Sequence, residues 1–177
     1  MSGLPPRPTA FKPCGECSLC CRLLDAPELE KPPGLWCRHH LHGQGCGIHA
    51  VRPDLCRAFQ CQWSLSPAVD EAWRPDRCHF ILWAQVDGQL LADVDPDFPD
   101  AWRAEPFYSQ LKSWSAPGRL QVIVRIDKHM FMLFPEADID MGLQQMEKEI
   151  DWGYRTNFDG RRAPYARFVE PRPRPAP

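Results

Sequence analysis

Cysteine is the residue type that could do chemistry in this chain, and its distribution is strongly uneven. Eight of the nine cysteines lie between Cys14 and Trp63, and only Cys78 follows them. Two-residue spacings let two sulfurs converge on one metal, while N–H groups of the turn offset the thiolate charge. Disulfides and buried, unreactive thiols are the alternatives. The clustered cysteines are Cys14, Cys17, Cys20, Cys21, Cys37, Cys46, Cys56 and Cys61.

The cellular compartment helps to decide between metal binding and disulfides. The residues before Cys14 contain no apolar core that could serve as a signal peptide, so we expect the chain to stay in the reducing cytoplasm. Disulfides need an oxidising compartment, and metal binding is therefore favoured. We predict that all eight clustered cysteines are metal ligands.

The order of these residues resembles a known family. The run Cys14-x-x-Cys17-x-x-Cys20-Cys21, then Cys37, then Cys46-x-Ile48-His49-x-x-Arg52-Pro53-x-x-Cys56-Arg57-x-Phe59-x-Cys61, is similar to the CxxCxxCC cluster of YkgJ-like proteins. The resemblance covers about the first third of the chain and implies a zinc- or iron-chelating domain. The bacterial flagellin lysine methylase carries a similar cluster, so the resemblance also leaves open a metal-cluster-dependent enzyme that modifies proteins.

The spacing leaves two kinds of metal open. Cys14, Cys17 and Cys20 reproduce the first three cysteines of the bacterial ferredoxin run, which favours an iron–sulfur cluster of the 4Fe–4S type with a fourth ligand from a later cysteine. However, Cys21 replaces the usual continuation of that run. Eight thiolates equally suit two tetrahedral zinc sites that only hold the fold. We favour iron–sulfur, because a contiguous three-cysteine loop suits one corner-bound cluster.

Other residues in or near the motif are open to less specific interpretations. Arg52 and Arg57 can offset the charge of a thiolate-rich site, although Arg57 suits an exposed helix face equally well. His49 fits packing as much as ligation, and we expect Cys78 to be simply buried. Histidines in a polar turn are usually solvated, and we interpret three of them in this way. They are His39, His40 and His42.

Missing motifs and the low net charge exclude several classes of function. The radical-SAM spacing Cys-x3-Cys-x2-Cys is absent, as are Gly-x-Gly-x-x-Gly and Gly-x-Ser-x-Gly, so we do not expect an enzyme acting on its own. The formal net charge of -2 provides no field for nucleic acid or an anionic membrane. No apolar run approaches the roughly 20 residues that span a bilayer. We expect a structural, metal-handling or electron-transfer protein that binds a metal ion or cluster and docks a protein partner.

The elements that must position the cysteines are short. The first predicted helix places three cysteines on one face, and a hairpin brings Cys37 near Cys46. The second helix points Cys56 and Cys61 about 140° apart unless it ends near Gln60. These elements are a helix at 17–24, a hairpin of 35–41 with 46–48, and a helix at 54–63.

After Pro67 the pattern becomes that of ordinary packing. Alternating apolar residues beside turn signals predict two hairpins, and apolar residues at helical spacing predict two helices. The hairpins join 79–86 to 89–94 through Asp87-Gly88 and 120–126 to 129–134 through Asp127-Lys128, and the helices are at 106–115 and 138–150. We interpret the carboxylates of Asp93, Asp95, Asp97 and Asp100 as a solvated turn, not a calcium loop.

These elements together predict an α+β fold, in which a small metal-bound half with short helices packs on two hairpins and two helices. The predicted organisation is a flexible lead-in at 1–13, a cysteine-cluster region at 14–66, an α+β region at 67–168 packed with it as one compact domain, and a disordered tail at 169–177.

Overall fold

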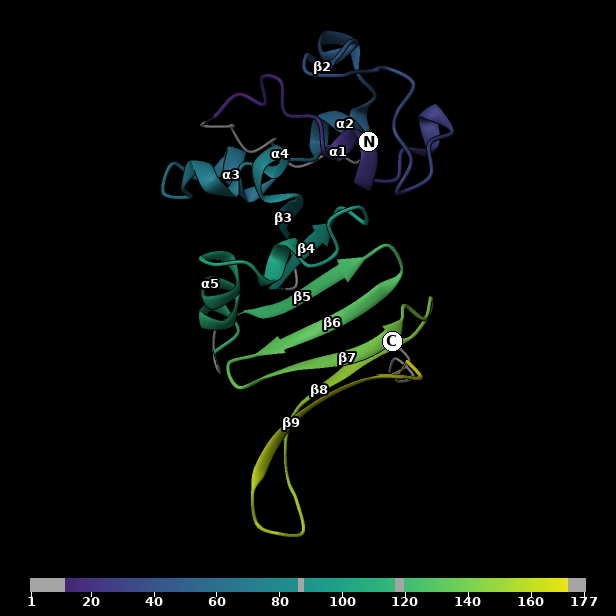
Figure 1. The fold of residues 1–177 in the computed structure, drawn as a ribbon. Helices are drawn as coiled ribbons and strands as arrows, with labels where there is room; N and C mark the ends of the chain where they lie inside the picture. Colours follow the sequence, from purple (N-terminus) through teal and green to yellow (C-terminus); the bar gives the residue numbers. More distant parts are fainter. Residues whose placement is uncertain (1–11, 86–87, 117–119, 172–177) are drawn as a thin grey trace, which may run out of the picture.

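A five-stranded sheet lies at the centre of the structure, a computed structural model that describes residues 12–85, 88–116 and 120–171. Figure 1 shows the cysteine-rich residues above this sheet and a long two-stranded hairpin below it. Helices and strands occur together, so the predicted α+β class is confirmed. Within the described ranges, every helix is too short or too polar to traverse a lipid bilayer.

The central sheet has the strand order β3-β4-β5-β6-β7. Neighbouring strands are antiparallel except β4 and β5, which are parallel because the chain crosses over between them through η4 (Ala101–Arg103) and α5 (Phe107–Trp114). The strands are β3 (Phe80–Ala84), β4 (Gln89–Val94), β5 (Gln121–Ile126), β6 (His129–Phe134) and β7 (Ala137–Leu143).

The predicted hairpins β3–β4 and β5–β6 are confirmed, and so is the helix α5. Asp87, in the first predicted turn, lies outside the described residues. The solvated turn is wrong for Asp93 and Asp95, which are buried, whereas Asp97 and Asp100 are exposed. Asp93 receives two hydrogen bonds from Arg125 on the neighbouring strand, which offset the cost of its burial.

The predicted helix at 138–150 is wrong, because these residues form the edge strand β7 and the start of a further strand. Ile139 and Met141 stand two residues apart and both pack against the core, which is the period of a strand. Gly142 and Glu147 have φ angles of 70° and 69°, which a right-handed helix does not contain.

A hairpin of β8 (Glu149–Thr156) and β9 (Arg162–Val169) was not predicted. Ile150 and Phe168 at its base pack against one face of the sheet, and its other end extends away from the body in Figure 1. Val169, assigned to the predicted tail, closes β9, and residues 172–177 of that tail lie outside the described residues.

The cysteine-rich residues form short helices and one small hairpin. The helix predicted at 17–24 begins only at Cys20, and the helix predicted at 54–63 is split by extended backbone at Phe59 and Cys61. The predicted hairpin is present but shorter. The elements are α1 (Cys20–Leu23), η1 (Pro27–Leu29), β1 (His40–Leu41), β2 (Gly45–Cys46), η2 (His49–Val51), α2 (Asp54–Ala58), α3 (Gln62–Leu65), η3 (Glu71–Trp73) and α4 (Pro75–Cys78).

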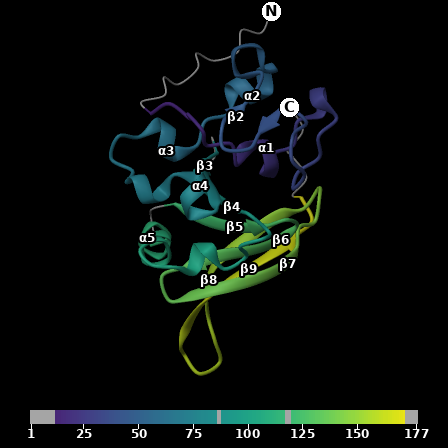
Figure 2. The ribbon, with the colours of Figure 1, turned by 45° about the horizontal axis from the view of Figure 1, so that its top comes forward.

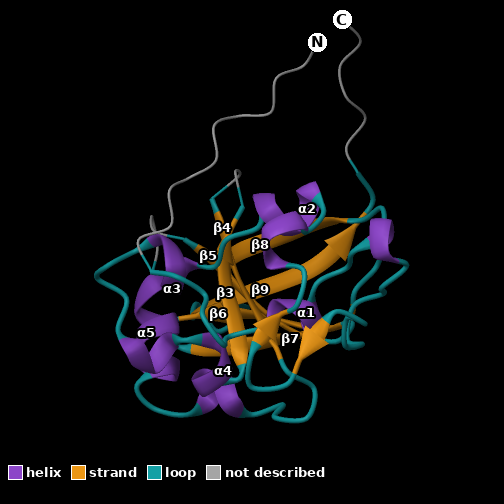
Figure 3. Cartoon of the chain, turned by 90° about the horizontal axis from the view of Figure 1, so that it is seen from above, coloured by secondary structure: helices purple, strands orange, loops and turns teal. Residues whose placement is uncertain are grey.

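One hydrophobic core joins these short elements to the sheet. Leu19 and Cys61 are buried together with Phe80 of β3 and with residues of α5. Figure 3 shows α3, α4 and α5 grouped on one side of the strands. On the opposite face, Ile123 and Phe134 are covered by β8 and β9, which run beside β7 in Figure 2. The cysteine-rich elements are therefore held by a layer that packs on one face of the sheet.

Candidate metal centre

Helix α1 carries Cys20 and Cys21 and is fixed to the sheet by an ion pair. Nη1 of Arg22 lies 2.8 Å from Oδ1 of Asp95, and the two side chains are only 12% and 5% exposed. The same Nη1 also lies 2.8 Å from Oδ2 of the exposed Asp97. Because Asp95 follows β4 directly, the ion pair connects the cysteine helix to the end of a central strand.

A tight turn before α1 holds two further cysteines. The N–H of Cys17 donates to the carbonyl of Cys14 at 3.0 Å. Gly45 packs closely against this turn: a Cβ at Gly45 would lie 2.7 Å from the carbonyl oxygen of Gly15, so only glycine allows the approach. The close packing brings Cys46, the next residue, against the Cys14–Cys17 turn.

Backbone contacts connect the small hairpin to α1. The N–H of Cys37 donates to the carbonyl of Cys21 at 2.8 Å, and the carbonyl of Cys37 accepts from the N–H of His40 at 2.9 Å. His40 in turn pairs with Cys46 across β1 and β2. Cys37 and Cys46 therefore lie near each other and near α1, as the predicted hairpin required.

The break between α2 and α3 separates the last two cysteines. Cys56, in α2, lines a cavity, whereas Cys61, just before α3, is buried in the hydrophobic core beside Leu19. Residues five apart on one continuous helix point about 140° apart. The break at Phe59 instead lets each cysteine take a direction set by its own short helix.

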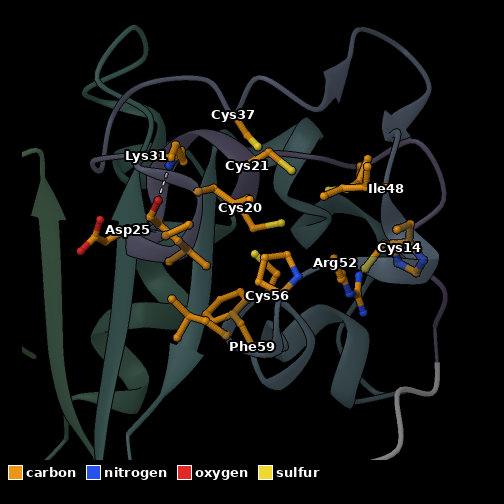
Figure 4. A pocket seen from close by; sticks show the side chains of 18 of the residues that line it. Cys14, Cys20, Cys21, Asp25, Lys31, Cys37, Ile48, Arg52, Cys56 and Phe59 are labelled. Carbon is orange, nitrogen blue, oxygen red and sulfur yellow. Dashed lines mark hydrogen bonds between the residues drawn. The ribbon is translucent and has the colours of Figure 1, made fainter.

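Seven of the eight predicted ligands line a single cavity of about 310 Å³ (Figure 4). Apolar side chains, among them Leu24, Leu55 and Phe59, form much of the remaining wall. Cys61 lies outside the lining and belongs to the hydrophobic core. The cysteines that line the cavity are Cys14, Cys17, Cys20, Cys21, Cys37, Cys46 and Cys56.

The adjacent cysteines of α1 have opposite protonation preferences. A hydrogen bond from Cys20 lowers the pKa of Cys21 to about 7, and the charges of Lys31 and Arg52 and a hydrogen bond from Cys46 act in the same direction. The same Cys20–Cys21 hydrogen bond, together with burial, raises the pKa of Cys20. Cys21 is therefore the one of the pair that loses its proton more readily.

Burial keeps other thiols of the cavity protonated. It raises the pKa of Cys17 to about 11. Burial also raises the pKa values of Cys14, Cys46 and Cys56. Because a metal binds thiolates, occupation of this site must release several protons, and metal affinity must rise with pH.

The two arginines of the motif have different roles. Arg52 lines the cavity, and its charge lowers the pKa of Cys21, in agreement with the predicted compensation of thiolate charge. Nε of Arg57 instead donates to the carbonyl of Arg52 at 2.8 Å, so Arg57 supports the backbone of the residue that faces the thiols.

Lys31 is a cavity residue that the sequence did not predict. It is only 6% exposed, and its Nζ donates to the carbonyl of Arg22 at 2.8 Å and to that of Leu24, at the end of α1. Burial lowers the pKa of Lys31, and the negative charges of nearby thiolates raise it again in part. Lys31 stands among prolines and glutamates, so no local signal identified it.

The remaining predicted residues lie at the edge of the site or away from it. His49 lines the cavity but is exposed, and His40 stacks on Trp36 with ring centroids 4.0 Å apart. His42 is exposed, as expected for a solvated histidine. Cys78 is buried, as predicted, and its Sγ contacts the carbonyls of two neighbouring core residues.

The thiols are gathered around a space and do not meet at a point. Across the ranges that the structure describes, no three side chains of His, Cys, Asp or Glu are grouped closely enough to hold one metal ion. Comparisons with models of known protein families, with curated proteins and with solved structures each found no match.

Proposed function

We propose that this chain binds an iron–sulfur cluster through its clustered cysteines and acts as a non-catalytic protein in electron transfer or metal handling. The observation that carries the proposal is the cavity of about 310 Å³ lined by seven thiols. Thiolates are the ligands that iron–sulfur clusters take, and zinc accepts them as well. The resemblance to YkgJ-like cysteine clusters supports metal chelation by the same residues.

The spacing of the thiols favours a cluster over a single zinc ion. Sulfurs bound to one zinc lie about 2.3 Å from the ion, and tetrahedral geometry then puts them roughly 3.8 Å from one another. The seven thiols instead line a cavity of about 310 Å³. A 4Fe–4S cluster binds each thiolate at a different iron, so it suits sulfurs that surround a wider space.

An unpaired buried donor also fits a bound cluster. Nε of Arg52, on the cavity wall, is buried and has no hydrogen-bond partner among the described residues. Buried donors normally have partners, and the sulfurs of an iron–sulfur cluster accept hydrogen bonds. Arg52 and Lys31 would also offset the negative charge that the thiolates bring to the cluster.

The surface around the cavity supports a protein partner. Leu55 lines the cavity and is 46% exposed, and Val51 and Leu41 on neighbouring elements are 73% and 46% exposed. Exposed apolar side chains that gather around a site are typical of surfaces that bind other proteins. A partner docked over α2 and β1 would lie close to the cluster, as electron transfer requires.

The test is anaerobic purification followed by measurement of iron, zinc and acid-labile sulfide, with absorption spectra before and after dithionite. We expect iron and sulfide in equal amounts and a visible band that dithionite bleaches. Colourless protein that holds only zinc would overturn the cluster assignment. As matched variants, Cys17→Ser should lower the metal content and Cys78→Ser should not. Full metal retention in Cys17→Ser would contradict the ligand assignment.

A further inference from the structure

The far end of the β8–β9 hairpin extends away from the body, opposite the cysteine-rich elements (Figure 1). At its base, side chains up to Tyr154 on β8 and Ala166 on β9 pack against the sheet. Residues 155–164 continue beyond them and form the arm of the hairpin. The turn of the arm lies about 13 Å beyond Tyr154, since a strand rises about 3.3 Å per residue. A two-stranded hairpin alone is only marginally stable in water, so the stability of the body does not explain the arm.

The arm is basic although the whole chain is not. It contains three arginines and one aspartate, whereas the formal net charge of the chain is -2, so the remainder of the chain is acidic. The three arginines, Arg155, Arg161 and Arg162, are all exposed. The arm holds these cations away from the acidic body, which reduces repulsion between the body and a polyanion bound at the arm. The low net charge of the chain therefore does not exclude a polyanionic partner at this one place.

The arginines of the arm project from both faces of the two-stranded ribbon. Arg162 pairs with Thr156 and shares its face, so Arg155, the neighbour of Thr156 on β8, lies on the opposite face. Cζ of Arg162 lies 4.6 Å from the ring centroid of Tyr154. Cζ of Arg155 lies 5.9 Å from the ring centroid of Tyr165. Contact with an aromatic face orients a guanidinium and leaves its N–H groups able to donate to phosphate oxygens.

The turn at the end of the arm presents an aromatic side chain. The N–H of Asn157 donates to the carbonyl of Arg161 at 2.8 Å, and the N–H of Gly160 donates to the carbonyl of Asn157 at 3.0 Å. Phe158, inside this hydrogen-bonded turn, is fully exposed. An apolar side chain such as phenylalanine can contact the methyl group of thymine in the major groove of DNA.

We propose that the arm enters the major groove of duplex DNA, where its arginines contact phosphates and Phe158 contacts thymine methyl groups. The groove is about 12 Å wide and about 8.5 Å deep, so it admits a two-stranded ribbon, and the arm is long enough to reach its floor. Phosphates line the groove on both sides, which matches cations on both faces of the ribbon. A lipid surface would instead favour cations on one face. This DNA-binding site is independent of the proposed metal centre.

The test is fluorescence anisotropy of a short, labelled DNA duplex titrated with the full chain at several salt concentrations. Neutralisation of three phosphates predicts a slope of about -3 for log K against log salt concentration. Arg155→Gln/Arg162→Gln should bind much more weakly, with a slope of about -1. Arg155→Lys/Arg162→Lys keeps both charges and should keep the slope. The matched control Arg77→Gln/Lys128→Gln removes two exposed charges from the body and should bind as the parent does.

The contact of the aromatic tip with thymine is tested separately. Phe158→Ser releases no counterions, so it should weaken binding severalfold and leave the salt slope unchanged. A duplex in which deoxyuridine replaces thymidine lacks the methyl groups. The parent should bind this duplex as weakly as Phe158→Ser binds the original one. Unchanged affinity in both experiments would contradict the thymine contact.

Several results would overturn the proposal that the arm enters the groove. It is wrong if the parent does not bind the DNA duplex at low salt, if the control variant loses as much affinity as Arg155→Gln/Arg162→Gln, or if the lysine variant loses the slope. Equally tight binding to single-stranded DNA or to vesicles of anionic phospholipid would also overturn it, because neither has a major groove. Duplex RNA should bind weakly, since its major groove is too narrow for side chains to read, and binding equal to that of DNA would contradict entry into the groove.

Discussion

The buried ion pair between α1 and the sheet makes a strong prediction about stability. The change Asp95→Asn removes one charge and leaves the shape of the side chain nearly the same. Arg22 and Asp95 are almost fully buried, so removal of the aspartate charge leaves the guanidinium with one exposed partner, Asp97. We expect the variant to be clearly less stable and to hold α1 less firmly against β4.

The magnitude follows from the geometry. At an effective dielectric constant of about 20, unit charges 2.8 Å apart attract by roughly 6 kcal/mol. Desolvation cancels part of this attraction, and loss of one partner of a buried pair costs roughly 3–5 kcal/mol. Because Arg22 keeps Asp97, we expect the lower end, about 3 kcal/mol. For a chain of this length, that corresponds to a fall of about 6–12 °C in Tm.

The assay is thermal unfolding of the purified protein, with Asp97→Asn as the matched control. Asp97 contacts the same nitrogen at the same distance, but its side chain is 66% exposed, so water screens its charge. We expect the control to melt within error of the parent. Equal losses in the two variants, or a larger loss in Asp97→Asn, would refute the argument that burial decides the strength of this ion pair.

Three further predictions concern other parts of the chain. Although burial opposes it, hydrogen bonds from Lys112 and Tyr108 lower the pKa of Asp138, so its stabilisation exists at neutral pH and disappears as the pH falls below about 4. The urea midpoints of Asp138→Asn and the parent should therefore differ at pH 7, the gap should narrow as the pH falls from about 4 toward the lowered pKa of Asp138, and a constant gap would refute this. Cys78→Ser should cost about 1 kcal/mol in a thermal melt, because a hydroxyl can replace the thiol donor, while elemental analysis shows unchanged metal. In metal-free protein, iodoacetamide labelling of Cys21 should have a midpoint near pH 7, whereas Cys17 should label only at much higher pH, and similar midpoints by mass spectrometry would contradict the assigned shifts.

Elements built from local patterns were predictable, and elements decided by pairing were not. Two hairpins with short turns and α5 behind its proline follow from the sequence alone. The stripe from Ile139 to Ile150 has helical spacing, but Leu143 and Met146 within it are exposed. The free edge of β6 offers backbone hydrogen bonds to the segment that follows it in the chain. Pairing of this segment with β6 as β7 outweighs the helical spacing of its apolar residues. Strands β8 and β9 were missed for the same reason, because their pairing with each other, and not a local pattern, determines their structure.

In the candidate site, the cysteines could be identified from their residue type, whereas the charged residues around them could be identified only from the fold. Few side chains can bind a soft metal, so cysteine spacing alone marked the candidate ligands. A compensating cation only has to be near in space, and lysine is common on surfaces, so nothing in its sequence context distinguished Lys31. Arg22 and Asp95 lie 73 residues apart, and only the fold brings them together. The charge around a cluster influences its reduction potential. The reduction potential of such a centre would therefore depend on charged residues such as Lys31, which the sequence alone does not identify.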